Sequence, residues 1–348
     1  MSAKGHGEKI LVLGAGNFGT CLAQHLAEKG YGVTIWARSP EVVEGINNSR
    51  KNPKYLSAVT LSSRLTAINR IESRHVEEAS IVLLATSAQS LSSVLPAIKM
   101  DLKPHHLLIC ASKGIEVGTM RLPTQIISDC LGPEIADKST FLSGPSFASE
   151  VANRQPTAVV VASRDAKRAA WAQELFHAAH FRVYTSEDPV GLEVAGALKN
   201  VIAIAAGASV GIGFQMNSRA ALITRGLAEI TRVGVALGAN PLTFKGLGGV
   251  GDLFLTCTSE KSRNFTVGFR LGRGESLDEI LSSMGSVAEG VATTKAAYDL
   301  SKKLRVETPI IDEVYKVLYE RKPITQAVMD LVTRDAKPEF DYEVPKNL

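Results

Sequence analysis

Short apolar runs alternate with segments of helical periodicity along the first half of the chain. Residues 10–13 form one such run, a glycine-rich turn follows at once, and residues 18–29 then carry the pattern of an amphipathic helix. Buried strands of this length with helices between them are typical of a parallel sheet covered by helices. We predict further strands at 33–36, 81–85, 107–110, 140–142 and 158–161, and a long irregular connection over 47–64.

Helical periodicity dominates after Asp188, where strand-like runs largely stop. This change predicts an all-α unit behind the sheet, with the boundary near residues 187–189. The predicted division of the chain is 8–188, 189–335 and a polar tail at 336–348. Within the second unit we predict helices at 190–209, 218–237, 277–282, 293–304 and 310–320.

One stretch, residues 194–212, is apolar enough to be compared with a membrane span. It carries Lys199 and Asn200 near its middle and is rich in Ala and Gly. A charged residue at that depth is expensive in a bilayer, so we predict a buried helix of the protein core and no membrane insertion.

Composition excludes several classes of protein. Of the 348 residues 45% are hydrophobic, which excludes a disordered chain. Lys and Arg number 39 against 35 Asp and Glu, and a net charge of +4 indicates a small anionic ligand and not a nucleic acid. The four cysteines and the histidines show no metal-binding spacing, and the polar start lacks the apolar core of a signal peptide. We therefore expect a cytoplasmic protein without a metal.

The turn after the first predicted strand has the pattern G-x-G-x-x-G, formed by Gly14, Gly16 and Gly19. Gly14 permits a tight turn, Gly16 lets a pyrophosphate approach the backbone, and Gly19 allows the helix to pack closely on the strand. The free N–H groups of the helix N-terminus then favour phosphate. Because the pattern lies between a strand and a helix, it predicts a dinucleotide-binding, Rossmann-type doubly wound sheet. The alternative is an ordinary glycine turn.

The end of the second predicted strand bears on the choice of dinucleotide. Enzymes specific for NAD usually place a carboxylate there, against the ribose 2′-hydroxyl. This chain instead has Arg38, 19 residues after Gly19, which predicts pairing with a 2′-phosphate and a preference for NADPH. The alternative is a solvated surface arginine.

Two later predicted strands are also followed by polar residues. Lys113 comes after residues 107–110, and Gly144 and Ser146 come after residues 140–142. Ligands of open α/β sheets bind at the carboxyl ends of the strands, so these residues are placed to meet one. An exposed lysine and a plain turn are the alternatives.

Lys199 is surrounded by apolar residues on its predicted helix. A lysine centred on such a face loses hydration, which lowers its pKa and makes it a usable base near neutral pH. The alternative is a lysine whose tip reaches water. Residues on the same helical face are Leu192, Ala195, Gly196, Ile202, Ala203 and Ala206.

Two further motifs lie in the helical half. A glycine-dense loop at 246–251 ends in Asp252, and such loops let the backbone approach a ligand. Ser262, Arg263 and Asn264 group a hydroxyl, a guanidinium and an amide that together can hold a phosphate. Taken alone, this triplet is also compatible with ordinary surface.

These motifs, in this order, resemble those of the soluble NAD(P)-dependent sn-glycerol-3-phosphate dehydrogenases of bacterial type. The resemblance covers residues 9–329, and its most specific parts are Ala-Leu-Lys-Asn-Val at 197–201 and the later Ser-Arg-Asn. It implies a Rossmann-type domain followed by an all-helical substrate domain. It also implies a cytoplasmic homodimer that supplies glycerol 3-phosphate for phospholipid synthesis.

The resemblance also implies roles for matched residues. The cofactor NADP or NAD would contact Asn17, Phe18, Arg38, Lys113, Ala148, Arg263, Val287 and Glu289. The phosphorylated substrate would contact Lys113, Gly144, Ser146, Lys199, Asp252, Ser262, Arg263 and Asn264. Lys199 would exchange the proton of the substrate C2 hydroxyl, Lys113 would stabilise charge on that oxygen, and Asp252 would orient Lys199.

Two other functions fit parts of the pattern. A related two-domain dehydrogenase acting on a hydroxy acid would also use a lysine on a helix, but it would not need the Ser262–Asn264 cluster. A dinucleotide-sensing regulatory protein would need no buried lysine and would normally add a recognisable binding module, which the sequence lacks.

Overall fold

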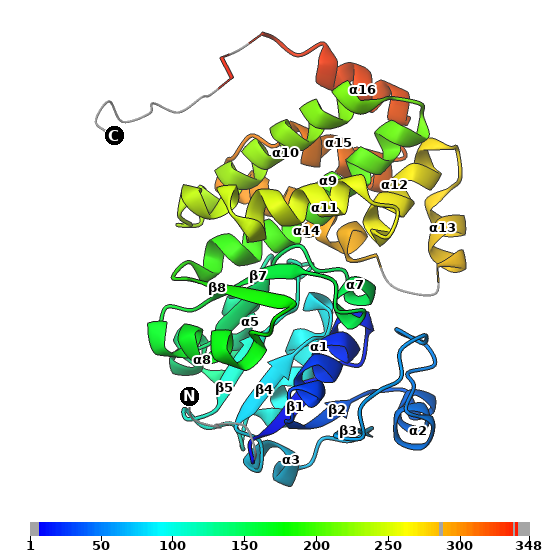
Figure 1. The fold of residues 1–348 in the computed structure, drawn as a ribbon. Coiled ribbons are helices and arrows are strands. Elements are labelled where there is room, and N and C mark those ends of the chain that lie inside the picture. Colours follow the sequence, from blue (N-terminus) through cyan, green and yellow to red (C-terminus); the bar gives the residue numbers. More distant parts are fainter. Residues whose placement is uncertain (1–6, 285–287, 337, 340–348) are drawn as a thin grey trace.

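The computed structural model describes residues 7–284, 288–336 and 338–339. An eight-stranded sheet flanked by helices forms the first part of the chain, and helices alone form the second (Figure 1). The strands are β1 (Lys9–Leu13), β2 (Gly32–Trp36), β3 (Leu65–Ile68), β4 (Ile81–Leu84), β5 (Leu107–Cys110), β6 (Thr140–Ser143), β7 (Thr157–Ala162) and β8 (Phe181–Ser186).

The sheet order is β3-β2-β1-β4-β5-β6-β7-β8, which contains the doubly wound order of a dinucleotide-binding domain. All neighbouring strands are parallel except β6 and β7. The predicted parallel, doubly wound sheet is therefore confirmed, with one antiparallel pair that was not predicted. The chain between β6 and β7 carries only the five-residue helix α7 (Ala148–Ala152), which is too short to cross back along the sheet.

Helices cover both faces of the sheet because successive strand residues point to opposite sides. Ile10 and Val12 of β1 pack with α1, α2 and α8, whereas Leu11 and Leu13 pack with α3 to α6. The helices of this part are α1 (Asn17–Glu28), α2 (Pro40–Ser49), α3 (Ser73–Glu77), α4 (Leu91–Val94), α5 (Pro123–Leu131), α6 (Pro133–Asp137), α7 and α8 (Ala166–Phe176), with 3-10 turns η1 (Ala88–Ser90) and η2 (Leu95–Ile98).

The second part is built around α9 (Pro189–Gly211), as Figure 1 shows. The other elements are η3 (Pro241–Lys245), the π-helical turn η4 (Leu247–Gly251), α10 (Met216–Ala236), α11 (Asp252–Thr258), α12 (Arg263–Gly272), α13 (Leu277–Ser283), α14 (Glu289–Leu304), α15 (Pro309–Tyr319) and α16 (Ile324–Val332). The five predicted helices are present, with ends shifted by no more than four residues.

Helix α9 is long and apolar enough to span a membrane by length and composition, and no other helix of the described residues is. However, 89% of its most apolar window is buried inside the protein. A Cβ on Gly207 would lie 2.0 Å from the carbonyl oxygen of Phe265, and one on Gly268 would lie 1.9 Å from that of Ile204. The two glycines therefore allow α9 and α12 to touch backbone to backbone. This contact brings the start of α12 close to the middle of α9.

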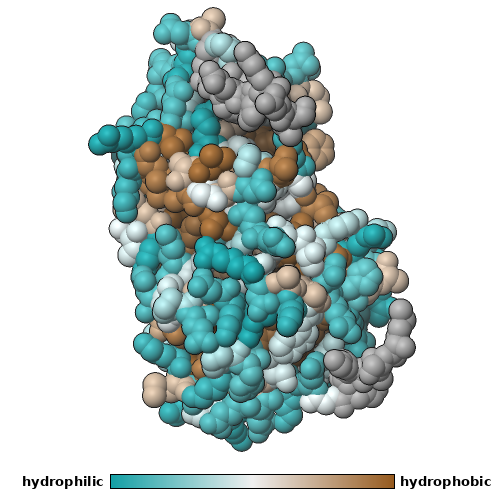
Figure 2. Space-filling view, turned by 90° about the vertical axis from the view of Figure 1, so that its left-hand side faces the viewer, coloured by the Kyte–Doolittle hydropathy of each residue, from teal (hydrophilic) through white to brown (hydrophobic). Residues whose placement is uncertain are grey.

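The surface of the helical part is the more apolar of the two. Figure 2 shows hydrophobic residues gathered over it on one face of the molecule. Most of the exposed large apolar side chains belong to this part, among them Val235, Leu242, Val250 and Phe254.

Candidate active site

A cavity of about 1060 Å³ lies where the carboxyl ends of the strands meet the helical part. Its walls come from the segments that follow β1, β2, β4, β5 and β6, and from α9, α12 and the start of α14. Carboxyl ends of parallel strands are where open α/β sheets bind their ligands, so the fold itself places a site here.

The glycine turn after β1 forms one wall of the cavity. Gly14 has φ +118°, and a Cβ there would lie 2.7 Å from the carbonyl oxygen of Ala85. A Cβ on Gly19 would lie 1.9 Å from the carbonyl oxygen of Gly14, whereas one on Gly16 would meet no atom within 4 Å. Gly16 therefore leaves the N-terminus of α1 open to the cavity, with no acidic residue in its first turn. This end of α1 suits the phosphates of a dinucleotide.

The irregular segment at 50–64 is tied to the same turn. The Asn17 side chain accepts a hydrogen bond from the backbone N–H of Leu56 at 3.0 Å. Asn52 is fully buried and donates to the carbonyl oxygen of Ala15 and to the hydroxyl of Thr20, both at 2.9 Å. These bonds hold residues 54–59 in the cavity wall, a role that the sequence did not indicate.

The end of β2 carries the predicted arginine and an unpredicted lysine. Arg38 is exposed and lines the cavity. Lys54 lies beside it, with its Nζ 3.2 Å from the hydroxyl of Ser39 and 2.8 Å from a carboxylate oxygen of Glu41. Two cations therefore border the place where the 2′-position of a bound adenosine ribose is expected.

One hydroxyl in the wall has no partner. Thr86 follows β4, and its buried hydroxyl oxygen makes no hydrogen bond within the described structure. Buried polar groups are nearly always satisfied, so this hydroxyl is available to a ligand. Together with the open turn at Gly16, it fits a dinucleotide laid along the carboxyl edge of the sheet.

Lys199 and Lys113 share one carboxylate at the inner end of the cavity. Lys199 Nζ donates to Oδ1 of Asp252 at 2.5 Å, and Lys113 Nζ donates to Oδ2 at 2.7 Å. Asp252 is 1% exposed and Lys199 is 7% exposed. The lysine predicted from its apolar helical face is therefore buried, with an acidic partner from α11.

Burial and charge act in opposite directions on this group. Burial lowers the pKa of Lys199 to about 8, although the Asp252 carboxylate opposes that change. Burial also disfavours ionisation of Asp252, but the two ammonium groups outweigh it and hold the pKa of its carboxyl below the ordinary value. Lys199 can therefore take up and release a proton near neutral pH.

The start of α12 faces the same cavity. Ser262 caps the helix by accepting from the backbone N–H of Phe265 at 3.3 Å, and Asn264 accepts from that of Gly290 at 2.9 Å. Arg263 is exposed to the cavity. A helix N-terminus with an arginine in its first turn is a suitable site for a phosphate.

Glu289, at the start of α14, also lines the cavity. Burial raises the pKa of its carboxyl to about 7, against the opposing charges of Arg263, Lys113 and Lys199. The neighbouring predicted residue Val287 lies outside the described residues.

Most of the predicted site residues come together in the cavity wall. Those that line it are Gly14, Gly16, Asn17, Phe18, Arg38, Lys113, Ser146, Ala148, Lys199, Ser262, Arg263, Asn264 and Glu289. Gly19, Gly144 and Asp252 lie behind the wall. Gly144 is buried with φ +140°, and its carbonyl oxygen accepts from the Ser146 hydroxyl at 2.9 Å.

Sequence reasoning missed three residues on the helical side. Lys261, Asn200 and Thr256 line the cavity. Lys261 pairs with Glu150 of α7 at 2.7 Å and so bridges the two parts of the chain. Asn200 could have been identified from its polarity within the apolar run, but an exposed lysine on a loop gives no such signal.

The family models agree with this geometry along nearly the whole chain. Residues 9–169 match the N-terminal model of NAD-dependent glycerol-3-phosphate dehydrogenase, and residues 188–329 match its C-terminal model. Within the described residues, no group of three or more His, Cys, Asp or Glu is arranged to hold a metal ion.

Individual relatives agree as well. A glycerol-3-phosphate dehydrogenase [NAD(P)+] of Geobacter metallireducens is 51% identical over 333 residues, 96% of this chain and 99% of that protein. The one of Limosilactobacillus reuteri (strain DSM 20016) is 47% identical over 335 residues, 95% and 99% of the two chains. The crystal structure of glycerol-3-phosphate dehydrogenase from Coxiella burnetii superposes with a TM-score of 0.89 at 34% identity, over 94% of this chain and 99% of that one.

More distant structures share the fold alone. A D-mandelate dehydrogenase superposes with a TM-score of 0.58 at 15% identity, over 92% of this chain and 99% of that one. The hydroxy-acid dehydrogenases that remained as an alternative from the sequence are therefore similar in architecture but far in sequence.

Proposed function

The chain belongs to the NAD-dependent glycerol-3-phosphate dehydrogenase family, and on that premise we propose which of its residues perform the reaction. The enzyme interconverts sn-glycerol 3-phosphate and dihydroxyacetone phosphate with NAD(P)(H). The observation that carries the proposal is the pair of lysines held on one buried carboxylate, Asp252.

Lys199 is the general acid and base. In the oxidative direction its neutral amine accepts the proton of the C2 hydroxyl, and in the reductive direction its ammonium returns that proton. The bound nicotinamide supplies the hydride transfer to and from C2. This role is supported by the burial of Lys199, which lowers its pKa to about 8.

Lys113 stabilises the negative charge that develops on the C2 oxygen, and Asp252 holds both ammonium groups towards it. The proposal is supported by the distances of 2.5 Å and 2.7 Å from Asp252 to the two lysines. Since Asp252 lies behind the wall, it acts through the lysines and orients them.

The substrate phosphate binds at the start of α12, against Arg263, Asn264 and Ser262. The N-terminus of α12 at the cavity and the exposed guanidinium of Arg263 support this assignment. Gly144 and Ser146, at the end of β6, complete the substrate pocket. Holding the phosphate away from the reacting carbon uses binding energy to orient C2, so loss of the phosphate lowers turnover as well as affinity.

The dinucleotide lies along the glycine turn formed by Gly14, Gly16 and Gly19. We propose NADPH as the preferred cofactor, with Arg38 and Lys54 against the 2′-phosphate. The ring of Phe18 lies beside Lys113, whose Nζ is 5.9 Å from the ring centroid, so this end of the turn is next to the reacting atoms. Other proposed cofactor contacts are Asn17, Ala148, Arg263 and Glu289.

Four further proposals rest on the resemblance to the family. The domain boundary lies between residues 188 and 189, with a tail from residue 336. The enzyme is a homodimer, a state compatible with the exposed apolar side chains of the helical part. It is cytoplasmic, and it supplies glycerol 3-phosphate for phospholipid synthesis. Light scattering of the purified protein tests the homodimer.

The test of the function is the rate of NADPH oxidation with dihydroxyacetone phosphate, compared with unphosphorylated dihydroxyacetone and with NADH. We expect rapid turnover on the phosphorylated ketone alone, and a higher kcat/KM with NADPH. Equal turnover of the two ketones would refute the phosphate site at α12. Turnover of hydroxy acids without phosphate would instead favour the related hydroxy-acid dehydrogenases.

A further inference from the structure

Lys113 lies on a loop and not on a helix or strand. Residues 111–122 connect β5 to α5 without regular secondary structure. The Lys113 ammonium must nevertheless stay on Asp252, which belongs to α11, 139 residues further along the chain. A loop that carries a residue of the reaction needs contacts of its own to fix it.

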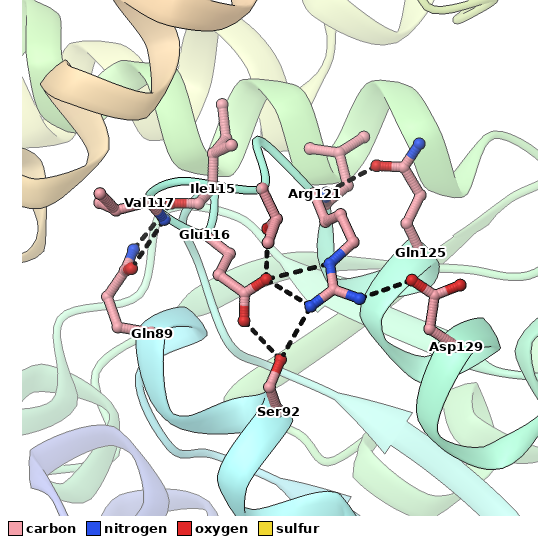
Figure 3. Close-up of polar contacts among 10 residues, drawn as sticks. Gln89, Ser92, Ile115, Glu116, Val117, Arg121, Gln125 and Asp129 are labelled. Atoms are coloured by element: carbon pink, nitrogen blue, oxygen red, sulfur yellow. Dashed lines mark hydrogen bonds and ion pairs between the residues drawn. The ribbon is translucent and has the colours of Figure 1, made fainter.

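A buried carboxylate three residues later provides such contacts. Glu116 is 8% exposed, and its two oxygens accept hydrogen bonds from four donor groups (Figure 3). Ser92 of α4 donates to Oε1 and Thr119 to Oε2. The guanidinium of Arg121 donates to Oε2 from Nε at 3.0 Å and from Nη2 at 2.7 Å. Glu116 therefore joins the later half of the loop, residues 116–121, to α4.

Gln89 fixes the same stretch through its backbone. Its side-chain amide donates to the carbonyl oxygen of Ile115 at 2.7 Å and accepts from the backbone N–H of Val117 at 2.9 Å (Figure 3). Gln89 belongs to η1, which follows directly on the cavity-lining residues after β4. The loop and the wall of the cofactor cavity are thus held to each other.

The residue between Lys113 and Ile115 transmits this restraint. Gly114 has φ +144°, and a Cβ there would lie 3.0 Å from Cβ of Ala88 and 3.3 Å from the hydroxyl of Thr293. The chain is therefore packed between η1 and α14 at Gly114. Because Lys113 is only two residues from Ile115 and three from Glu116, we expect a shift of either residue to move Lys113 as well.

The contacts require a carboxylate at residue 116. Burial disfavours ionisation, but the bonds from Ser92 and Thr119 and the charge of Arg121 outweigh it and hold the pKa of Glu116 below its ordinary value. An ionised carboxylate accepts at both oxygens and carries the charge that pairs with Arg121, whereas a glutamine is neutral and places N–H donors at one of the two oxygen positions. The isosteric Glu116→Gln change thus removes the ion pair with Arg121 and an acceptor of the network while keeping the volume of the side chain.

We infer that Glu116 is a positioning residue for Lys113, and that together with Gln89 it keeps the Lys113 ammonium on Asp252 and in the active site. The inference rests on the proposed role of Lys113 in the reaction. Glu116 itself does not line the cavity, so it acts through the loop.

A double-mutant cycle tests the inference. The proteins are the wild type, Glu116→Gln, Lys113→Ala and the combination, assayed for reduction of dihydroxyacetone phosphate with NADPH. We expect Glu116→Gln to lower kcat/KM about tenfold to a hundredfold, the effect of a displacement of about 1 Å at a reacting group. In the Lys113→Ala background the same change should cost little more, because the group it positions is absent.

The matched control is Asp129→Asn. Asp129 accepts from the opposite side of the same guanidinium, from Nη1 of Arg121 at 2.5 Å, but it does not touch the loop at 113–117. This variant should keep the wild-type kcat/KM. An equal loss in this variant would attribute the effect to Arg121 in general and would overturn the inference.

The pH profile gives a readout that a merely structural role would not move. The Lys113 ammonium lowers the pKa of Lys199, and Asp252 raises it. If Lys113 moves away, its lowering effect is lost and the pKa of Lys199 rises. The fall of reductive kcat/KM at alkaline pH should therefore occur at a higher pH. The other groups that face Lys199 are Glu289 of α14 and Cys257 of α11, and the substitution leaves both in place.

Each outcome decides between the alternatives. Independent losses that multiply in the double variant, or an unshifted alkaline limb, would overturn the role of Glu116 and leave that of Lys113 intact. Wild-type activity of Lys113→Ala would refute the proposed function of Lys113 and the inference with it. If Glu116→Gln shows no cooperative thermal unfolding, Gln89→Ala, which removes two loop bonds and no charge, takes its place in the same cycle.

Discussion

Replacing Asp252 by asparagine should move the pH dependence of the enzyme in a direction that only the shared-carboxylate arrangement predicts. The change keeps the shape of the side chain and removes a negative charge that lies 2.5 Å from Lys199 Nζ and 2.7 Å from Lys113 Nζ. Two ammonium groups then remain together in a buried site. Lys199, the more buried of the two, should give up its proton more easily.

The magnitude follows from the distance. An opposite charge in direct contact moves a pKa by about one to three. Without Asp252 the pKa of Lys199, about 8 in the wild type, should therefore fall to about 6. At pH 7 a group with a pKa of about 8 is about nine-tenths protonated, and one with a pKa of about 6 about one-tenth. The loss of protonated acid alone should lower the reductive kcat/KM at neutral pH about tenfold.

The assay is the pH profile of kcat/KM for dihydroxyacetone phosphate reduction, which reports groups of the free enzyme. The reductive kcat/KM of the wild type should fall as the pH rises through about 8. In Asp252→Asn the same fall should occur about two pH units lower. Oxidation of glycerol 3-phosphate should show the mirror image, since it needs the neutral amine. If the fall in reductive kcat/KM of Asp252→Asn occurs at the same pH as in the wild type, or at a higher pH, the assignment of Lys199 as the acid is refuted.

Three other predictions follow from the same structure. Lys199→Met should lower kcat about 10²- to 10⁴-fold while dinucleotide binding, measured by NADPH fluorescence, is retained; near-normal turnover would exclude Lys199 as the base. Arg38→Ala and Lys54→Met should each lower kcat/KM for NADPH about tenfold to a hundredfold and change that for NADH little, and parallel losses with both cofactors would contradict a 2′-phosphate site. Glu193, whose carboxylate is buried on α9 and accepts from the backbone N–H of Thr124 at 2.7 Å, has a pKa raised by burial to about 8. Because this folded-state pKa lies above the unfolded value, the free energy of unfolding of the wild type should fall as the pH rises from about 4.5 to about 8. Near pH 8 the Glu193→Gln variant should therefore be about 1–3 kcal/mol more stable than the wild type. Equal slopes of melting temperature against pH for the two proteins would contradict this.

The parts of the fold that local pattern controls could be predicted from the sequence. Buried strands and the apolar helix α9 have continuous apolar runs, so their positions were predicted within a few residues. The edge strands β3 and β8 were missed because they are short or alternate, with Phe181 and Val183 buried and Arg182 exposed between them. Of the helices in the first part only α1 was predicted, so α2 to α8 were missed, although Pro40 at the first turn of α2 is a recognisable start signal. In the second part α11, α12 and α16 were missed.

The candidate site divides in the same way. Gly14, Gly16 and Lys199 lie in local patterns whose physical requirements are visible along a few turns of chain. The partner of Lys199 is 53 residues away, and no spacing rule links a lysine on one helix to the first residue of another. Lys54 and Lys261 come from irregular loops, where a lysine without a fold around it cannot be told from solvated surface. Tertiary contact, and not composition, assigns these residues to the site.

The charges of the inner site explain why two lysines share one acid. Lys199 and Lys113 bring two positive charges, and Asp252 forms an ion pair with each ammonium group through a different carboxylate oxygen. In the proposed reduction Lys199 is protonated, so the group carries an excess positive charge next to the neutral carbonyl of the ketone. When negative charge develops on the C2 oxygen, that oxygen completes the balance in a buried site, where charges interact more strongly than in water. The stabilisation is thus expected to be larger in the transition state than with the bound ketone, which is what an increase in kcat requires. A second acid in place of either lysine would remove that difference, and a site without Asp252 would lose the proton that Lys199 must hold.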